Sequence, residues 1–468
     1  MLEVGGEGRS VVVLLCVVMI VSVIVYGGVD TGMLALLSAV SAGILLIWGW
    51  SAWRSGRLSI NLSRLQLPMI GLVAIGLVQL LPLRDPGISP GVLGFPPAAS
   101  LSLDPYATRF FLARLVLYLV FFAAALTFVN TERRLKSVAS VVVIFGPLIA
   151  FFGILQWLER PESIYGLRPS PHAIPFGPYV NQHHFAALME MTIGVALGLL
   201  FGGGLKSNRR LFLILAVVVM AMAVVLTGSR GGMISLLGVA GFSLAASLLA
   251  RRRDETPRSA SAVIDGFSGR LSAVAGGTAI VLLVAGMAVY LGGGESLLRG
   301  VGLQNSAADP TSGRSHFWQI GLKIFLDHPL LGAGLDAFGA AFTRYDTASG
   351  LLRVEQAHND YLQILCDAGA IGFVCVAAYL YLLFSSGFRV ISGRGSALRR
   401  SVAIGALAGC FGIAIHSFFD FPLRTPANAY FFLMLSALAT VQVAERRESS
   451  RRRERQQKQH HRTSRVAA

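Results

Sequence analysis

About twelve long runs of apolar residues, separated by polar connections, dominate this sequence. Most reach the ~17–25 residues that a helix needs to cross a bilayer, and none alternates apolar with polar side chains as a half-buried strand does. Inside hydrocarbon the backbone must pair with itself, and continuous apolar runs do so as helices. The sequence therefore predicts an all-α, polytopic integral membrane protein with about twelve transmembrane helices. The runs cover residues 11–28, 33–50, 67–83, 112–129, 138–157, 184–203, 211–227, 233–250, 272–292, 361–388, 402–419 and 429–444.

The charge distribution supports this fold class and indicates which side of the membrane is cytoplasmic. Only 14% of the 468 residues are charged, whereas a soluble domain carries about a quarter. The net charge is +16, but the basic residues recur in short clusters between the apolar runs, which argues against nucleic acid as a partner. Placing the N-terminus in the cytoplasm puts most of the 40 lysine and arginine residues on the cytoplasmic side. We therefore expect an even number of helices, with both termini cytoplasmic.

The chain is expected to form one transmembrane domain, residues 1–444, followed by a basic cytoplasmic tail, residues 445–468, whose composition is typical of disorder. The first apolar run continues to Tyr26 without a convincing cleavage site, so we interpret it as a retained helix and not a signal peptide. The largest external segment, residues 293–360, lies between the ninth and tenth helices. It carries two amphipathic stretches on either side of Pro329, which predict an external cap of short helices.

Two external arginines are candidates for binding an anionic group. Arg230 lies in Thr227-Gly-Ser-Arg-Gly-Gly232, a very short predicted turn whose glycines allow a ligand to approach the backbone closely. Arg314 lies at the expected start of the first cap helix, where free N–H groups add to the positive field. A planar guanidinium suits bidentate phosphate contacts. Either residue could instead be an interfacial arginine that extends toward lipid head groups or lies on a helix surface.

His358 is the candidate proton acceptor. It lies in Gln356-Ala-His-Asn-Asp-Tyr-Leu362, where the large loop returns to the tenth helix. Histidine side chains titrate near neutral pH and can accept a proton from a hydroxyl nucleophile. The adjacent Asn359 and Asp360 could orient this histidine or bind the acceptor. The alternative is that His358 and Asp360 only cap a helix start at the membrane surface.

Weaker candidates lie at the sixth helix. Asn181, His183 and His184 precede it and could contact substrate. Glu190 lies about 9 Å deeper, at 1.5 Å per residue, and is expected to face protein or water instead of lipid.

Other polar residues predict contacts between helices. His416 and Asp420 flank the end of the eleventh helix and could form an interhelical pair. Gln79 and Gln156 are interpreted as interhelical hydrogen-bonding residues.

Several motifs of known chemistry are missing from the sequence. There is no DxD or acidic cluster in the predicted external segments, no Walker lysine, no zinc spacing and no GxSxG. The cysteines form no CxxC pattern and lie in or beside apolar runs, which favours buried thiols. We therefore expect no cofactor and no metal, so that external arginines would have to neutralise any bound diphosphate. The cysteines are Cys16, Cys366, Cys375 and Cys410.

Taken in order, these segments resemble the O-antigen ligase and O-antigen polymerase family of polytopic glycan-transfer enzymes. The resemblance extends over about residues 65–440 and is best defined over residues 205–430. Its most specific part is Ala357-His-Asn-Asp-Tyr-Leu362 running into Gly369-Ala-Ile-Gly372. The other matching segments are Gln79-Leu-Leu-Pro82, the stretch from Ser102 to Arg109, Asn181-Gln-His-His-Phe185, Thr227-Gly-Ser-Arg-Gly-Gly232, Ser312-Gly-Arg314 with Trp318, Asp327-His-Pro-Leu-Leu-Gly-Ala-Gly334, His416-Ser-Phe-Phe-Asp420 and Pro426-Ala-Asn428.

The resemblance implies a multi-pass enzyme of the bacterial inner membrane with its active site on the periplasmic face. Its donor would be a glycan linked to undecaprenyl diphosphate, and its acceptor a hydroxyl of lipid A-core or of another glycan. The resemblance also implies metal independence, with Arg230 and Arg314 holding the diphosphate while His358 assists the acceptor. We hypothesise an inverting glycosyl transfer with these roles.

Two alternatives to this hypothesis remain open from the sequence alone. The motifs do not distinguish a ligase from a repeat-unit polymerase, because both need the same donor chemistry. A rival from another class is a secondary transporter or lipid flippase, which predicts ionisable residues near the middle of the membrane. Glu190 and Asp367 are the acidic residues best placed for that. In the transferase hypothesis, His184 and either Arg160 or Arg168 would line the acceptor side.

Overall fold

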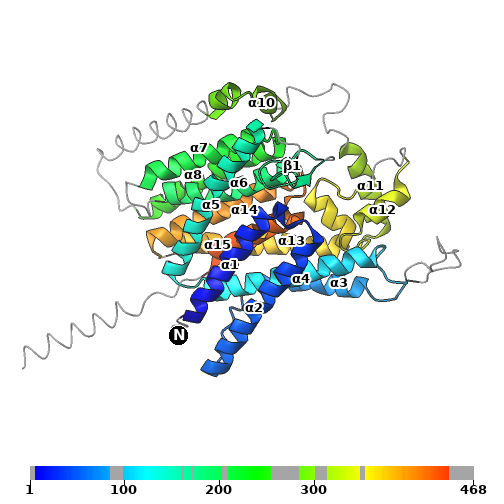
Figure 1. The fold of residues 1–468 in the computed structure, drawn as a ribbon. Helices are drawn as coiled ribbons and strands as arrows, with labels where there is room; N and C mark the ends of the chain where they lie inside the picture. The colour runs from blue at the N-terminus through cyan, green and yellow to red at the C-terminus, as the bar shows by residue number, and fades with distance from the viewer. Residues whose placement is uncertain are drawn as a thin grey trace, which may run out of the picture.

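The computed structural model is helical apart from its connections and one short β-ribbon (Figure 1). It describes residues 6–84, 99–159, 163–170, 173–202, 209–254, 284–300, 314–347, 354–393 and 395–441. The longer helices are α1 (Gly6–Ile24), α2 (Thr31–Ser55), α3 (Gln66–Gln79), α4 (Pro105–Phe128), α5 (Glu132–Glu159), α6 (Gln182–Phe201), α7 (Arg210–Leu226), α8 (Arg230–Asp254), α11 (Arg314–Asp327), α13 (Asp360–Ser392), α14 (Ala397–His416) and α15 (Pro426–Thr440). The short elements are η1 (Tyr26–Gly28), β1 (Ser163–Ile164), β2 (Arg168–Pro169), α10 (Gly294–Gly300), α12 (Phe338–Tyr345) and η4 (Pro422–Arg424).

Seven of the described helices are long and apolar enough to cross a membrane, namely α2, α4, α5, α6, α8, α13 and α14. Four shorter apolar helices, α1, α3, α7 and α15, accompany them. Together they coincide with every predicted run except 272–292, of which the structure describes a helical part from residue 284 onward. The structure therefore confirms the predicted fold class as an all-helical protein with seven described helices able to span a membrane. The predicted tail, residues 445–468, lies outside the described residues.

The sequence placed the start of α4 too late, because the first polar turn of this helix was not recognised. Its apolar run was predicted from residue 112, but the helix begins at Pro105. Asp104 is its N-cap and accepts a hydrogen bond from the N–H of Ala107 at 2.9 Å. An acidic N-cap followed by proline at the first helical position is a strong start signal.

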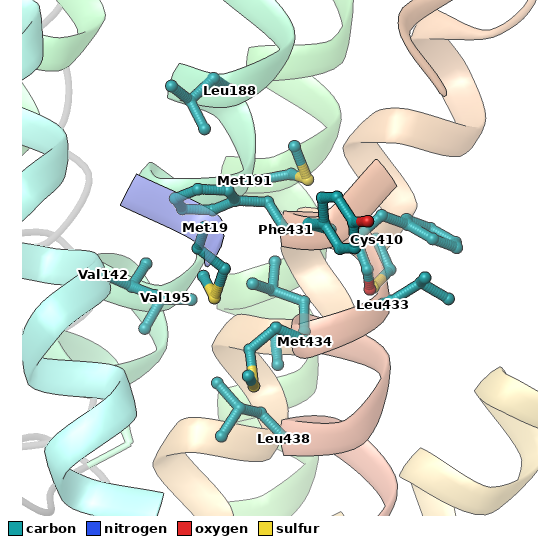
Figure 2. Packing of buried hydrophobic residues seen from close by; sticks show 14 of the residues in the cluster. Met19, Val142, Leu188, Met191, Val195, Cys410, Phe431, Leu433, Met434 and Leu438 are labelled. Atoms are coloured by element: carbon teal, nitrogen blue, oxygen red, sulfur yellow. The ribbon is translucent and has the colours of Figure 1, made fainter. Parts of the chain in front are cut away.

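The core lies around α6 and α14, which are the most enclosed of the candidate spans. Figure 2 shows side chains of α6, α14 and α15 packed in one apolar cluster, among them Met191, Cys410 and Met434. Glycines bring the backbones of α6 and α14 together. A Cβ on Gly198 would lie 2.3 Å from the backbone of Gly405. Small residues at a helix crossing allow this close approach inside a membrane.

This crossing predicts a large loss of stability for Gly198→Val. The added side chain would overlap backbone atoms of α14, which cannot rotate away as a side chain can. We expect the thermal unfolding midpoint of the detergent-solubilised protein to fall by several degrees or the folded peak to disappear, as measured by fluorescence-detected size exclusion. Gly241→Val in α8 is the control, because nothing lies within 4 Å of its Cβ position. Equal behaviour of the two variants would contradict the close crossing.

Helix α13 is broken at Gly369, which has φ 64° and ψ −164°. The loop formed by residues 329–334 lies against the break. The N–H of Ala333 donates to the carbonyl of Cys366 at 2.7 Å, and the N–H of Ala370 donates to a loop carbonyl at 2.8 Å. Irregular backbone at membrane depth is tolerated when protein satisfies its polar groups in this way. The break therefore fixes the loop to the helix.

Gln79 strengthens this junction from α3. Its side-chain amide donates to the carbonyls of Leu331, at 2.5 Å, and Asp367, at 2.8 Å, while its oxygen accepts from the N–H of Leu335 at 2.8 Å. The prediction of an interhelical hydrogen bond is confirmed for Gln79. It is wrong for Gln156 within the described part of the chain, where no residue offers its buried amide a hydrogen bond.

Helices α11 and α12 lie together at one end of the bundle, far from the N-terminus (Figure 1). They are the two amphipathic stretches predicted on either side of Pro329. Their apolar faces meet in a small separate core. The indole N–H of Trp318 donates to the carbonyl of Ala357 at 3.0 Å, which ties α11 to the residue before His358. The members of this core include Ile320, Ile324, Phe338 and Phe342.

Candidate active site

The candidate residues meet at the connection between α14 and α15, residues 417–425. Helices α6, α8, α11 and α13 all begin against this connection. Helix N-termini carry partial positive charge and free N–H groups, so their convergence favours an anion. The contacts join His184 to Thr425, Gly231 to Phe419, Arg314 to Phe419 and Asp360 to Ser417.

His358 and Asp420 form the central pair of this site. The Nδ1 of His358 lies 3.1 Å from Oδ1 of Asp420, so that Nδ1–H donates and the imidazole is fixed in one orientation. The His358 side chain is 29% exposed and that of Asp420 is 2% exposed, so part of the ring remains accessible beside a buried carboxylate. His358 has φ 51°, a left-handed conformation that non-glycine residues rarely adopt. Such backbone strain is concentrated at functional positions.

The Asp420 carboxylate remains charged despite its burial. Burial alone would raise its pKa, but the hydrogen bond from His358 and the nearby His183 and His184 hold it well below its ordinary value. A carboxylate beside several histidines stabilises positive charge on any ring that takes up a proton. His358 can therefore act as a base that a charged carboxylate orients.

Arg314 is the first residue of α11, where the sequence placed it. Its guanidinium lies 3.6 Å from Oδ2 of Asp420 and donates to the carbonyl of Phe419. Oδ2 of Asp420 accepts no hydrogen bond from the described residues. Since Arg314 is 24% exposed, its remaining N–H groups are available to a ligand beside His358.

Arg230 is the first residue of α8, whereas the sequence predicted a turn. The turn ends one residue earlier, because Ser229 starts the helix by accepting a hydrogen bond from the N–H of Gly232 at 3.1 Å. Gly231 packs against the connection, where a Cβ would lie 2.9 Å from Phe419. Helix α8 thus presents Arg230 at the same connection that Arg314 contacts.

His184 joins the site and Asn181 supports it. The Nδ1 of His184 lies 2.6 Å from the hydroxyl of Thr425, and its Nε2 lies 4.0 Å from Oδ1 of Asp420. Nε2 is buried and has no hydrogen-bond partner among the described residues, which is unusual for a buried polar atom. Asn181 is the N-cap of α6 and accepts from the N–H of His183 at 2.8 Å.

The side chains that follow His358 stabilise the chain around it. Asn359 caps α13 by accepting from the N–H groups of Tyr361 and Leu362. The Asp360 carboxylate accepts from the hydroxyl of Ser417 at 3.0 Å. The polar side chain that pairs with the His358 ring is Asp420, while the rings of Phe317 and Phe421 pack against it.

The predicted pairing of His416 with Asp420 is wrong. The Nδ1 of His416 lies 2.8 Å from Glu190 Oε1, with both side chains buried. The side chain of His416 pairs with α6, while that of Asp420 pairs with His358. Glu190 faces protein, as predicted.

Arg424 was missed by the sequence analysis. It forms ion pairs with Asp336, at 2.9 Å, and with Asp367, and its guanidinium lies over Phe111 at 4.6 Å. The scarcity of external arginines, which drew attention to Arg230, would also have identified it. Arg424 links the connection carrying Asp420 to α13 just before its break and to Asp336, which follows the loop of residues 329–334.

The arginines predicted on the acceptor side are not brought to this site by any described contact. Arg168 pairs with Asp30 at 2.5 Å and lies over the ring of Tyr26. Arg160 lies outside the described residues. Within the described ranges, no group of three or more His, Cys, Asp or Glu residues has the arrangement of a metal site.

Comparison with protein-family models matches residues 215–377 to the O-antigen ligase family. The match extends from α7 into α13 and includes Arg230, Arg314 and His358. Comparison with curated proteins found no match. The family match supports the assignment of this chain to the O-antigen ligase and polymerase family.

Proposed function

We propose that this protein transfers a glycan from an undecaprenyl-diphosphate-linked donor to an acceptor hydroxyl. The observation that carries the proposal is the pair of His358 and Asp420, placed beside Arg314 at the convergence of four helix starts. A base oriented by a buried carboxylate and flanked by fixed positive charge suits attack by a hydroxyl with departure of an anion.

In the proposed step, Nε2 of His358 accepts the proton of the acceptor hydroxyl. The acceptor oxygen then bonds to the anomeric carbon as the bond from that carbon to the phosphate oxygen breaks. Attack from the face opposite the leaving group inverts the anomeric configuration. Undecaprenyl diphosphate leaves with the bonding electrons, and Asp420 stabilises the imidazolium that has formed.

Arg230 and Arg314 would bind the diphosphate in this step. A departing diphosphate gains negative charge, so contacts that strengthen with this charge lower the barrier. Guanidinium groups can make these contacts without a metal ion. His184, whose Nε2 is buried next to Asp420, would lie on the acceptor side, with Asn359, Asp360 and Asn181 positioning the chain around it.

The membrane fold supports the proposed setting of the reaction. We place the site at the periplasmic face of the bacterial inner membrane, with both termini in the cytoplasm, because the sequence predicts the basic clusters on the side opposite the cap. The acceptor would be lipid A-core or another glycan, in lipopolysaccharide or surface polysaccharide synthesis.

Loss of the donor-binding arginines is expected to abolish surface glycan. Arg230→Ala and Arg314→Ala each remove a guanidinium from the diphosphate, so lipid-linked glycan should accumulate in cells that depend on this chain. The measurement is surface glycan by gel and blot, at matched membrane expression. Arg344→Ala is the control, since Arg344 is exposed on the cap beside Tyr345. Normal surface glycan in both site variants would overturn the proposal.

The accumulated donor also separates the two activities of the family. A cell without its ligase keeps full-length lipid-linked polymer, because polymerisation precedes ligation. A cell without its polymerase keeps single repeat units. We expect the ligase pattern, and a single-repeat band would assign the chain as a polymerase with the same donor chemistry.

A further inference from the structure

A small pocket, called the groove here, lies between α2, α4 and the start of α15 and has no role in the step described above. Its wall is apolar and includes Leu34, Leu37 and Leu117, and its polar residues include Asp30 and Arg114. The groove lies where the first turns of α2, the middle of α4 and the start of α15 meet. An apolar wall bearing charged groups suits an amphiphile and not a soluble sugar.

The charged side chain of Arg114 is the main evidence that this groove binds a ligand. It lies within the apolar helix α4, which begins at Pro105, and is therefore about 14 Å along the helix axis. It forms no hydrogen bond or ion pair with any residue that the structure describes. A charged side chain within a membrane-spanning helix is costly, and such residues commonly mark ligand sites.

The net charge of the groove indicates the charge that its ligand should carry. Asp30 is the N-cap residue of α2, and its carboxylate is paired with Arg168 at 2.5 Å. That pair is neutral, so Arg114 leaves the groove with a net positive charge. The complementary group is an anion, and a guanidinium binds phosphate with good geometry.

We infer that this groove binds a lipid whose phosphorylated head group carries a net negative charge, with the phosphate on Arg114 and the first methylenes on the half-buried Leu34 and Leu117. A free phosphate makes no use of the apolar side chains beside Arg114, whereas a lipid contacts both the charged and the apolar part of the wall. The inference rests on the proposed function, in which this lipid is the anchor of the acceptor.

The position of the groove favours the acceptor over the donor. The donor diphosphate is assigned to Arg230 and Arg314, next to Phe419. The groove is lined by Pro426 and Tyr430 of α15, just beyond the other end of the connection. The neighbouring Thr425 contacts His184 at 2.6 Å. A glycolipid held here would extend its sugars past His184 toward His358, opposite the donor.

Native mass spectrometry of the full-length protein released from nanodiscs tests the site directly. The probes are phosphatidylglycerol and phosphatidylcholine, with lipid A as a competitor. We expect selective retention of phosphatidylglycerol, its displacement by lipid A, and about tenfold weaker retention in Arg114→Gln, as for loss of one charge-assisted contact. Arg109→Gln is the matched control, since Arg109 is an exposed arginine of the same helix.

Each further outcome has a defined meaning. Unchanged retention of phosphatidylglycerol in Arg114→Gln, or equal retention of phosphatidylcholine, overturns the site. In transfer assays Arg114→Gln should raise the KM for the lipid acceptor about tenfold and leave the donor KM unchanged, and an unchanged acceptor KM overturns the acceptor assignment. His358→Ala should retain lipid normally. Full transfer by His358→Ala, with lipid loss in Arg114→Gln, would reject the proposed function and keep the lipid site.

Discussion

Replacing His358 by alanine is expected to lower the rate of glycan transfer by about two to four orders of magnitude, the usual contribution of a general base. The acceptor hydroxyl would lose the group that takes its proton, while the arginines and the helix starts would still bind the donor. The measurement is kcat with purified protein, lipid-linked donor and acceptor. We expect donor KM to change little, because the loss occurs in the transition state.

The chain contains a matched control for this variant. His316 pairs with Asp346 at 3.0 Å, in a second histidine–aspartate contact on the cap. His316→Ala therefore removes an equivalent contact away from Asp420, and its transfer rate should stay close to that of the wild type. If His316→Ala and His358→Ala lost equal activity, the effect would be one of cap stability and His358 would not be the base.

Replacing Asp420 by asparagine is expected to have the second-largest effect, a fall in kcat of about two to four orders of magnitude. An amide keeps the shape of the side chain but can turn its N–H₂ toward the ring, which favours the wrong tautomer and gives no stabilisation of the imidazolium. Asp346→Asn is the control, since it makes the same change in the other pair. A rate for Asp420→Asn within a few-fold of the wild type would leave His358 without an orienting partner.

Acid stability provides a second readout for Asp420. Its folded-state pKa is well below the ordinary value of 3.8, so its ionised form contributes stability at every pH above that value. The contribution is lost only as the pH falls through the lower folded-state pKa. The Asp420→Asn variant should therefore unfold at a lower temperature than the wild type at neutral pH, and the difference should shrink in strong acid.

The membrane fold could be predicted from the sequence because each apolar run must satisfy its own backbone hydrogen bonds in hydrocarbon. The sequence also located Arg230, Arg314 and His358, since an arginine or histidine at an external helix end is unusual on local grounds alone. The partner of His358 could not be found in that way. Asp420 lies 62 positions away, and its contact depends on how the start of α13 packs against the end of α14.

The break in α13 was beyond sequence reasoning for a related reason. Gly369 lies inside an apolar run that is long enough to span the membrane without interruption, and a lone glycine in such a run does not indicate a break. The conformation is decided by residues 329–334, which supply the missing backbone partners. Arg424 and Gln79 complete the junction from two further helices, so no local pattern contains it.

This junction also determines when the protein can reach its final form during synthesis. Residues 329–334 leave the ribosome before α13, but the arginine that neutralises Asp367 follows more than fifty residues later, at position 424. Until then the upper part of α13 has a buried acid without its counter-ion. The same late segment supplies Asp420. The ion pair that holds the α13 junction and the pair that orients His358 can therefore form only after residues 417–425 have been synthesised.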